Sequence, residues 1–142
     1  YHHITVLDIS ANVLERAKER LGSASSKINW VTEDITLFNP TEQFDVWHDR
    51  AVFHFLTEEN DIKSYVNTAY HSIKPGGLLI VGTFSTEGPT KCSGITIKQY
   101  SEETLSNVFN NGFTKINCFT TDHLTPFNTM QNFVFCTFKR NH

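Results

Sequence analysis

Short, mostly apolar runs alternate with amphipathic helical stripes along much of the chain. Such runs are typical of strands buried in a sheet, and apolar residues spaced three and four apart mark one face of a helix. The runs predict strands at Ile4–Asp8, Ile28–Thr32, Phe44–His48 and Gly77–Phe84. The stripes predict helices that begin near Ser10, Thr57 and Ser101. Alternation of strands and helices is typical of an α/β fold with a parallel sheet.

Local signals mark where these elements begin and end. Ser10 can cap the first helix with its side-chain oxygen, and Gly22 can end it. In the segment Lys74-Pro75-Gly76-Gly77 a helical stripe stops and an apolar run follows. This segment therefore predicts a turn from a helix into a buried strand. The long polar stretch Ser85–Gln99 is typical of a binding loop.

The C-terminal part predicts a different arrangement. Phe113–Thr121 and Gln131–Lys139 both resemble strands, and no helix fits between them. The two strands should therefore pair antiparallel. Seven of the twelve phenylalanines stand from Phe109 onward. They favour a packed core around this hairpin, and the alternative is the wall of an apolar pocket.

Composition excludes several classes of protein. The 142 residues carry a net charge of -3, and the twelve Lys and Arg are scattered, which argues against a nucleic-acid partner. No apolar run is long enough to span a membrane, and no signal-peptide pattern is present. Cys92, Cys118 and Cys136 are widely spaced and odd in number. They predict neither a disulfide framework nor a metal site, and they favour a cytoplasmic protein.

Four motifs stand in a fixed order at or near the ends of the expected strands. They are Val6-Leu7-Asp8-Ile9-Ser10, Glu33-Asp34-Ile35, Phe44-Asp45-Val46-Trp47-His48 and Lys74-Pro75-Gly76-Gly77. Together with the closing hairpin, they resemble the class I S-adenosylmethionine-dependent methyltransferases. The resemblance covers essentially the whole chain. It implies a Rossmann-like, mostly parallel sheet with a C-terminal antiparallel hairpin, and S-adenosylmethionine as the cofactor.

The chain departs from the family at its beginning. The family's first strand, Gly-rich loop and helix should precede Tyr1, and they are missing. Residues 1–142 are therefore expected to form a single, N-terminally incomplete methyltransferase domain. In the family the missing strand lies between the strands that here end at Asp8 and His48. Its loss should leave an unpaired sheet edge, through which the isolated chain is expected to self-associate.

Five residues are the predicted cofactor-binding set, and the fifth, His48, is also a predicted catalytic residue. Polar residues at the carboxyl ends of parallel strands line the ligand crevice of open α/β sheets. The resemblance implies that Asp8 accepts hydrogen bonds from the ribose hydroxyls and that Asp34 accepts one from the adenine amino group. Ile9 would pack on the adenine and Ile35 would offer it a backbone N–H. The alternatives are that Asp8 caps the helix, that Ile9 is core and that Asp34 is a solvated turn acid.

His48 and Asp49 are the predicted catalytic residues, and His48 also counts among those beside the cofactor. Methyl transfer requires alignment, and it requires a base only where the nucleophile carries a proton. The imidazole of His48 could be this base, with Asp49 orienting it. Arg50 could pair with Asp49 or with an acidic substrate. The alternative is a local salt bridge in a turn. His54 is interpreted as a buried histidine, and Cys92 as an unreactive loop cysteine.

The function predicted from the sequence is methyl transfer from S-adenosylmethionine to a small-molecule acceptor, and less readily to a protein side chain. One alternative is a non-catalytic methyltransferase-like fragment or binding module. Another is a nicotinamide-dependent oxidoreductase, because an acidic residue that ends the second strand also fits that fold. The closing hairpin and the Pro-Gly-Gly turn argue against the oxidoreductase. The sequence does not encode the identity of the acceptor.

Overall fold

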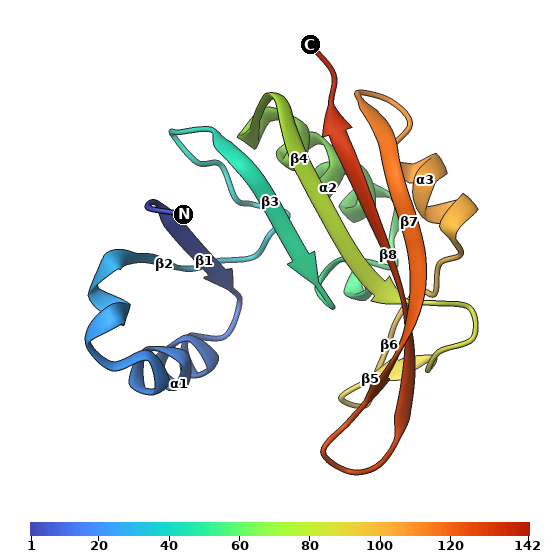
Figure 1. Cartoon of the computed structure of the whole chain (residues 1–142), viewed down its shortest axis with the longest axis horizontal. Coiled ribbons are helices and arrows are strands. Elements are labelled where there is room, and N and C mark those ends of the chain that lie inside the picture. The colour runs from blue at the N-terminus through green and yellow to red at the C-terminus, as the bar shows by residue number, and fades with distance from the viewer. The chain divides into compact units, whose positions relative to one another are not determined.

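The computed structural model describes residues 1–142. They group into two compact units, residues 1–39 and residues 40–142 (Figure 1). The first unit contains β1 (Ile4–Asp8), α1 (Ala11–Leu21) and β2 (Ile28–Thr32). β1 and β2 pair in parallel, from Ile4 opposite Ile28 to Asp8 opposite Thr32. The unit is therefore a strand–helix–strand crossover, and both strand ranges match their predictions.

Capping explains the ends of α1. The Ser10 hydroxyl accepts a hydrogen bond from the Val13 N–H at 3.3 Å, which satisfies one free donor of the first turn. Gly22 ends the helix with a φ of 56°, a conformation that costs glycine little. Both caps were predicted. The segment Gly22–Lys27 that follows α1 is a 3₁₀ helix.

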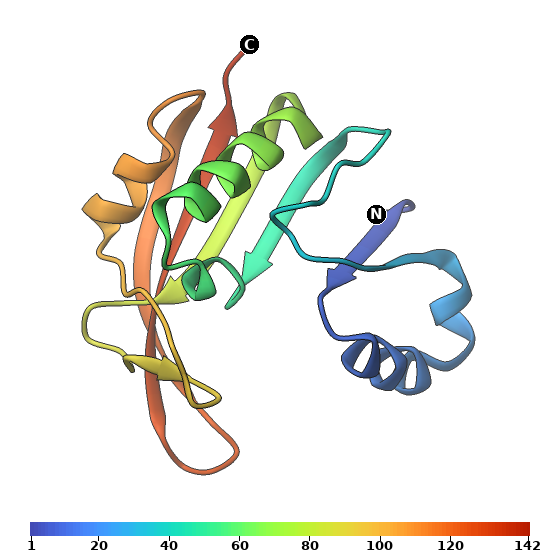
Figure 2. The same cartoon turned by 180° about the vertical axis from the view of Figure 1, so that it is seen from behind.

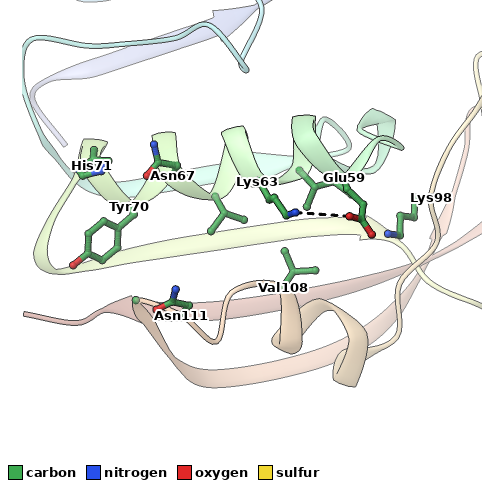
Figure 3. A pocket seen from close by; sticks show the side chains of 11 residues that line it. Glu59, Lys63, Asn67, Tyr70, His71, Lys98, Val108 and Asn111 are labelled. Carbon is green, nitrogen blue, oxygen red and sulfur yellow. Dashed lines mark ion pairs between the residues drawn. The ribbon is translucent and has the colours of Figure 1, made fainter.

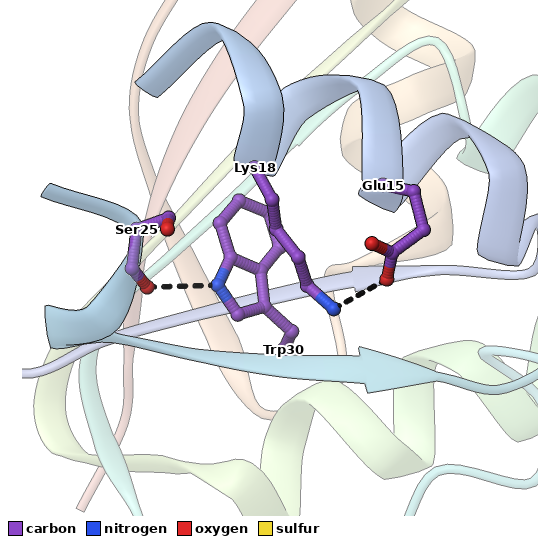
Figure 4. Close-up of polar contacts among 4 residues, drawn as sticks. All are labelled: Glu15, Lys18, Ser25 and Trp30. Atoms are coloured by element: carbon purple, nitrogen blue, oxygen red, sulfur yellow. Dashed lines mark hydrogen bonds and ion pairs between the residues drawn. The ribbon is translucent and has the colours of Figure 1, made fainter. Parts of the chain in front are cut away.

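Trp30 joins the elements of the first unit (Figure 4). Its indole N–H donates to the Ser25 carbonyl oxygen at 3.0 Å. The Lys18 ammonium lies 5.8 Å from the centroid of the Trp30 ring and 2.6 Å from the Glu15 carboxylate. One tryptophan therefore contacts α1 and the 3₁₀ segment from its place on β2.

The second unit is built on a four-stranded sheet of order β3-β4-β8-β7. β3 pairs with β4 in parallel, and the other two pairings are antiparallel. Figures 1 and 2 show α2 and α3 on one face of this sheet. The strands and helices are β3 (Phe44–Arg50), α2 (Glu59–Ser72), β4 (Ile73–Phe84), α3 (Glu102–Val108), β7 (Phe113–Leu124) and β8 (Met130–Arg140). The predicted closing hairpin is β7–β8.

Aromatic side chains fill the space between the helices and the sheet. The ring of Phe53 lies 4.8 Å from that of Tyr65 and 5.3 Å from those of Tyr100 and Phe109. Phe109 in turn lies 5.1 Å from Phe138 on β8. All five side chains are buried. Phe109 and Phe138 of the C-terminal part therefore belong to the core, as predicted, whereas Phe119 and Phe127 are exposed.

Several boundaries differ from the predictions. β3 continues to Arg50 instead of ending at His48, and β4 begins at Ile73, directly after the helix. The N-cap of α2 is Glu58 instead of Thr57, and its side chain makes no capping hydrogen bond. The predicted loop Ser85–Gln99 contains a small antiparallel pair, β5 (Lys91–Cys92) and β6 (Ile95–Thr96).

The cysteine prediction was wrong in one respect. Cys118 and Cys136 form a disulfide, with Cα atoms 4.1 Å apart. The two residues are directly opposite each other in the β7–β8 register, so the pairing of the strands brings their side chains together. Spacing along the chain does not reveal such a cross-strand pair. Cys92 is free and partly exposed.

The outer strands of each sheet have only one neighbour. β1 and β2 pair with each other alone, β3 pairs with β4 alone and β7 pairs with β8 alone. Each therefore presents a row of unpaired backbone groups along one edge. The single-domain assignment and the self-association expected from an exposed edge stay predictions. No helix of the chain is both long enough and apolar enough to cross a bilayer.

Candidate cofactor and acceptor site

Asp8 is the last residue of β1, where a parallel strand meets the following helix. Its side chain is half-buried, and its Oδ1 accepts a hydrogen bond from the Ser10 N–H at 2.8 Å. The cap of α1 is Ser10, so Asp8 supports the turn before the helix without serving as its N-cap. Its second carboxylate oxygen remains for a ligand. The backbone oxygen of Asp8 accepts from the Glu33 N–H at 3.1 Å, which holds the ends of β1 and β2 together.

The Asp34 segment follows β2 at the same edge of the parallel pair. Oδ1 of Asp34 accepts hydrogen bonds from the N–H of Thr36 at 2.9 Å and from its hydroxyl at 2.7 Å. The turn-forming role and a ligand-binding role are compatible, because both bonds use the same oxygen. Ile35 is half-buried, and Ile9 is 71% exposed. An isoleucine this exposed, next to Asp8, is available to cover an apolar ring.

β3 separates the residues of the His48-Asp49-Arg50 motif onto two faces. Successive side chains of a strand point to opposite faces, so His48 and Arg50 share one face and Asp49 lies on the other. His48 and Arg50 are exposed, whereas Asp49 is only 6% exposed and faces α2. The structure brings His48 and Arg50 to one surface. It gives no hydrogen bond between Asp49 and His48, although the charge of His48 acts to lower the pKa of Asp49.

Asp49 is hydrogen-bonded inside the unit. Its Oδ2 accepts from the Tyr65 hydroxyl at 2.6 Å, and its Oδ1 accepts from the Val52 N–H at 3.0 Å. Burial raises the pKa of Asp49, although the bonds from Tyr65 and Val52 act in the opposite direction. No hydrogen bond joins its carboxylate to His48. The orienting role predicted for Asp49 therefore lacks its contact, and the observed contacts hold β3 to α2.

His54 is a buried histidine, as the sequence favoured. Its Nδ1 accepts a hydrogen bond from the Phe84 N–H at 3.1 Å, and its buried Nε2 has no partner. Burial lowers the pKa of His54 to about 4, so the ring is neutral near pH 7. The residue anchors the 3₁₀ turn Phe53–Phe55 to the end of β4.

A small aromatic cluster lies at the carboxyl end of β4. Phe84, Ile97 and Phe133 are buried there, and Cys92 and Phe135 pack against them. Cys92 thus has an apolar setting on the short β5–β6 hairpin. A cluster of this kind at the end of a sheet can form one wall of an acceptor site. The sequence did not reveal it, because it joins four separate segments.

A groove of about 720 Å³ lies between α2 and α3 (Figure 3). Tyr70 and Asn67 line it from α2, and Asn111 lines it from the turn after α3. An ion pair of 3.7 Å between Lys63 and Glu59 lies along its wall. None of the predicted site residues lines this groove. No three His, Cys, Asp or Glu side chains gather as a metal-ion site requires.

Comparison with known proteins identifies the family. Residues 1–79 match the family described as Methyltransferase domain. The chain is 31% identical over 84 residues to malonyl-[acyl-carrier protein] O-methyltransferase 1 of Ilyobacter polytropus, covering 59% of this chain and 30% of that protein. It is 32% identical over 84 residues to nodulation protein S of Bradyrhizobium diazoefficiens, covering 59% and 40%. The chain thus spans less than half the length of these curated relatives.

Solved structures with the same fold include two methyltransferases. The N-methyltransferase NodS from Bradyrhizobium japonicum superposes with a TM-score of 0.79 at 18% identity, covering 99% of this chain and 74% of that one. The glycopeptide N-methyltransferase MtfA, complexed with S-adenosylmethionine, gives 0.72 at 14% identity, covering 97% and 72%. These likenesses confirm the predicted Rossmann-like α/β class.

The chain therefore belongs to the methyltransferase domain family, in the class I, S-adenosylmethionine-dependent group that its four motifs predicted. S-adenosylmethionine is the methyl donor of this group, in agreement with the predicted cofactor.

Proposed function

We propose that this chain contributes the adenosine-binding residues and part of the acceptor site of an enzyme that transfers a methyl group from S-adenosylmethionine to a small molecule. The observation that carries the proposal is the position of Asp8. Its half-buried carboxylate ends β1 of a parallel strand–helix–strand unit, inside the segment that matches the methyltransferase family.

The chemistry of the first unit fits the adenosine part of the cofactor. Asp8 has one carboxylate oxygen left for a ribose hydroxyl after its bond to Ser10. Asp34 has one left for the adenine amino group after its bonds to Thr36. Ile9 is exposed and can cover one face of the ring. Carboxylates that accept hydrogen bonds at a strand end recognise ribose in this way in other open α/β sheets.

When bound, S-adenosylmethionine supplies an electrophilic methyl group on a sulfonium that is a good leaving group. The chain then has to hold the acceptor, exclude water and remove a proton where the acceptor carries one. His48 is exposed on β3, where its imidazole can act as a general base. We assign His48 the role of this base. Asp49 acts indirectly, because it fixes the turn that follows β3 through the Val52 N–H.

Two relatives favour a small or carrier-bound acceptor. One is named as a malonyl-[acyl-carrier protein] O-methyltransferase, and the other as nodulation protein S. The solved structure NodS, which this chain also resembles, is an N-methyltransferase. These activities belong to those proteins, and they differ in the atom that is methylated. They support an acceptor with an oxygen or nitrogen nucleophile. They do not favour the nicotinamide-dependent alternative.

Competition for labelled cofactor tests the choice of cofactor. Tritiated S-adenosylmethionine would be incubated with the chain, and its retention measured with rising S-adenosylhomocysteine or NADH. We expect S-adenosylhomocysteine to displace the label and NADH to leave it bound. Displacement by NADH alone would support the oxidoreductase alternative.

Transfer itself is tested with the longest protein that contains this chain. Labelled S-adenosylmethionine would be offered with matched sets of small carboxylates, amines and thiols. We expect label in the product of one set and a large loss of transfer in the His48→Gln variant. A protein that binds cofactor but labels no set would support the non-catalytic alternative.

A further inference from the structure

Arg50 is a cation without an acidic partner in its unit. It ends β3 and is exposed, directly opposite Gly82 of β4 in the parallel register. The ion pairs formed within residues 40–142 are Lys63–Glu59 and Lys74–Asp45, and neither includes Arg50. For Arg50 the sequence left two possible partners open, which were Asp49 and an acidic substrate. Because Asp49 lies on the other face of the strand, the acidic substrate is the remaining candidate partner.

Phe133 holds the guanidinium of Arg50 in place. The guanidinium carbon lies 5.3 Å from the centroid of the Phe133 ring, within the range of a cation–π contact. Phe133 is itself buried, in the cluster that includes Phe84 and Cys92. A guanidinium stacked on a ring keeps its N–H groups in its own plane, where they can form a fork to a carboxylate. Arg50 is therefore oriented without its donors being consumed.

The charges at this end of the sheet separate by face. Strand alternation places three side chains on one face, those of His48, Arg50 and His123. The ring of His123 lies 6.2 Å from that of Phe133. The carboxylates of Asp49 and Asp122 alternate to the opposite face, and Asp122 accepts a hydrogen bond there from Asn132 at 2.9 Å. The face of Arg50 therefore favours an anion.

We propose that Arg50 binds a carboxylate of the methyl acceptor, so that the substrate class is small organic acids with an apolar part that packs on the half-buried ring of Phe135 on the same face. This proposal rests on the proposed function, because it names the acceptor of the same site. Arg50 is an acceptor-binding residue, and His48, on the same face of β3, is the base assigned under the proposed function. No proton or methyl group passes through Arg50.

Matched ligand pairs test this assignment. Benzoate and benzamide have the same shape, and only benzoate carries the charge. Each would be titrated into the chain and followed by saturation-transfer NMR and by the Nε–Hε signals of its arginines. We expect benzoate to bind and to shift one such signal, and benzamide to bind about tenfold or more weakly, as the loss of a charged hydrogen bond implies.

Three variants locate the binding. Arg50→Gln should weaken benzoate about tenfold or more and remove the shifted signal. Arg50→Lys keeps the charge and the apolar stem and should retain part of the binding, which guards against a folding defect. Arg20→Gln removes an exposed arginine of α1 and should change nothing. Equal binding of benzoate and benzamide, binding that survives in Arg50→Gln, or inorganic phosphate binding as well as benzoate would each overturn the proposal.

The role of Arg50 and the proposed function can be overturned independently of each other. S-adenosylhomocysteine binding would be measured on the same variants, and Arg50→Gln should leave it unchanged. Lost benzoate selectivity with intact cofactor binding would overturn the role of Arg50 alone. Absent cofactor binding in the unmodified chain would overturn the proposed function, whatever benzoate does.

Discussion

The hydroxyl of Tyr65 on α2 donates to the buried carboxylate of Asp49 on β3 at 2.6 Å. The same carboxylate accepts from the Val52 N–H, and the Tyr65 hydroxyl accepts from the Trp47 indole N–H at 3.1 Å. This network fixes the carboxyl end of β3, which carries His48 and Arg50 on its outer face. A buried polar group therefore positions the two residues to which we assign acceptor chemistry.

Tyr65→Phe should destabilise the chain. The change removes the donor to Asp49 and leaves a buried carboxylate with one partner fewer, a loss of about 1–3 kcal/mol. Urea unfolding would measure the free energy of unfolding of both proteins. Tyr70→Phe is the matched control, because the hydroxyl of Tyr70 makes no hydrogen bond within the chain. Equal losses in the two variants would argue against a special role for the Tyr65–Asp49 bond.

Asp49 should make stability depend on pH in a defined direction. Burial raises its pKa in the folded chain above the ordinary value of 3.8. Between the two pKa values the folded chain holds a proton that the unfolded chain releases. The contribution of Asp49 to stability therefore falls as pH rises through that window. Asp49→Asn should remove this fall, as unfolding midpoints across the acidic range would show. Parallel curves for the two proteins would contradict the assignment.

The disulfide should stabilise the β7–β8 hairpin. It joins Cys118 and Cys136 across 18 residues of sequence, and a loop of that size corresponds to about 3 kcal/mol. Reduction should lower the midpoint of thermal unfolding, and Cys118→Ala/Cys136→Ala should match the reduced protein. Cys92→Ser, which leaves the disulfide intact, is the control. Identical midpoints for the oxidised and reduced chain would count against the bond.

Gly82 should tolerate no side chain. A Cβ at this position would lie within 2.8 Å of three atoms of the Phe135 ring, and Phe135 is directly opposite Gly82 in the β4–β8 register. Gly82→Ala should therefore cost about 1–3 kcal/mol. The same change should cost clearly less in a Phe135→Ala background, where the ring is absent, and a double-mutant cycle of unfolding energies would measure the difference. Equal costs in both backgrounds would exclude this overlap.

Local patterns predicted the first unit well. β1 and β2 follow from short apolar runs, and Ser10 and Gly22 follow from capping chemistry. Each of these signals lies within a few residues of the structure it specifies. For the same reason, the sequence correctly placed Asp8 at the end of a strand.

Features that depend on strand length or pairing were not predictable in the same way. Asp49 was expected to orient His48 at the tip of the strand that was predicted to end at His48. Because β3 is two residues longer than predicted, the alternation of its side chains places Asp49 in the core. The Cys118–Cys136 bond depends on the β7–β8 register, and the Arg50–Phe133 stack depends on two strands that are distant in the sequence.

The most direct test of the account is calorimetric titration of S-adenosylhomocysteine into this chain and into its Asp8→Ala variant. Glu33→Ala is the control, since Glu33 neighbours Asp34 and its side chain is assigned no contact with the cofactor. We predict binding to the unmodified chain and to Glu33→Ala, and a loss of about tenfold or more in Asp8→Ala. Unchanged affinity in Asp8→Ala, or no binding to the unmodified chain, would contradict the claim that these residues form the adenosine site.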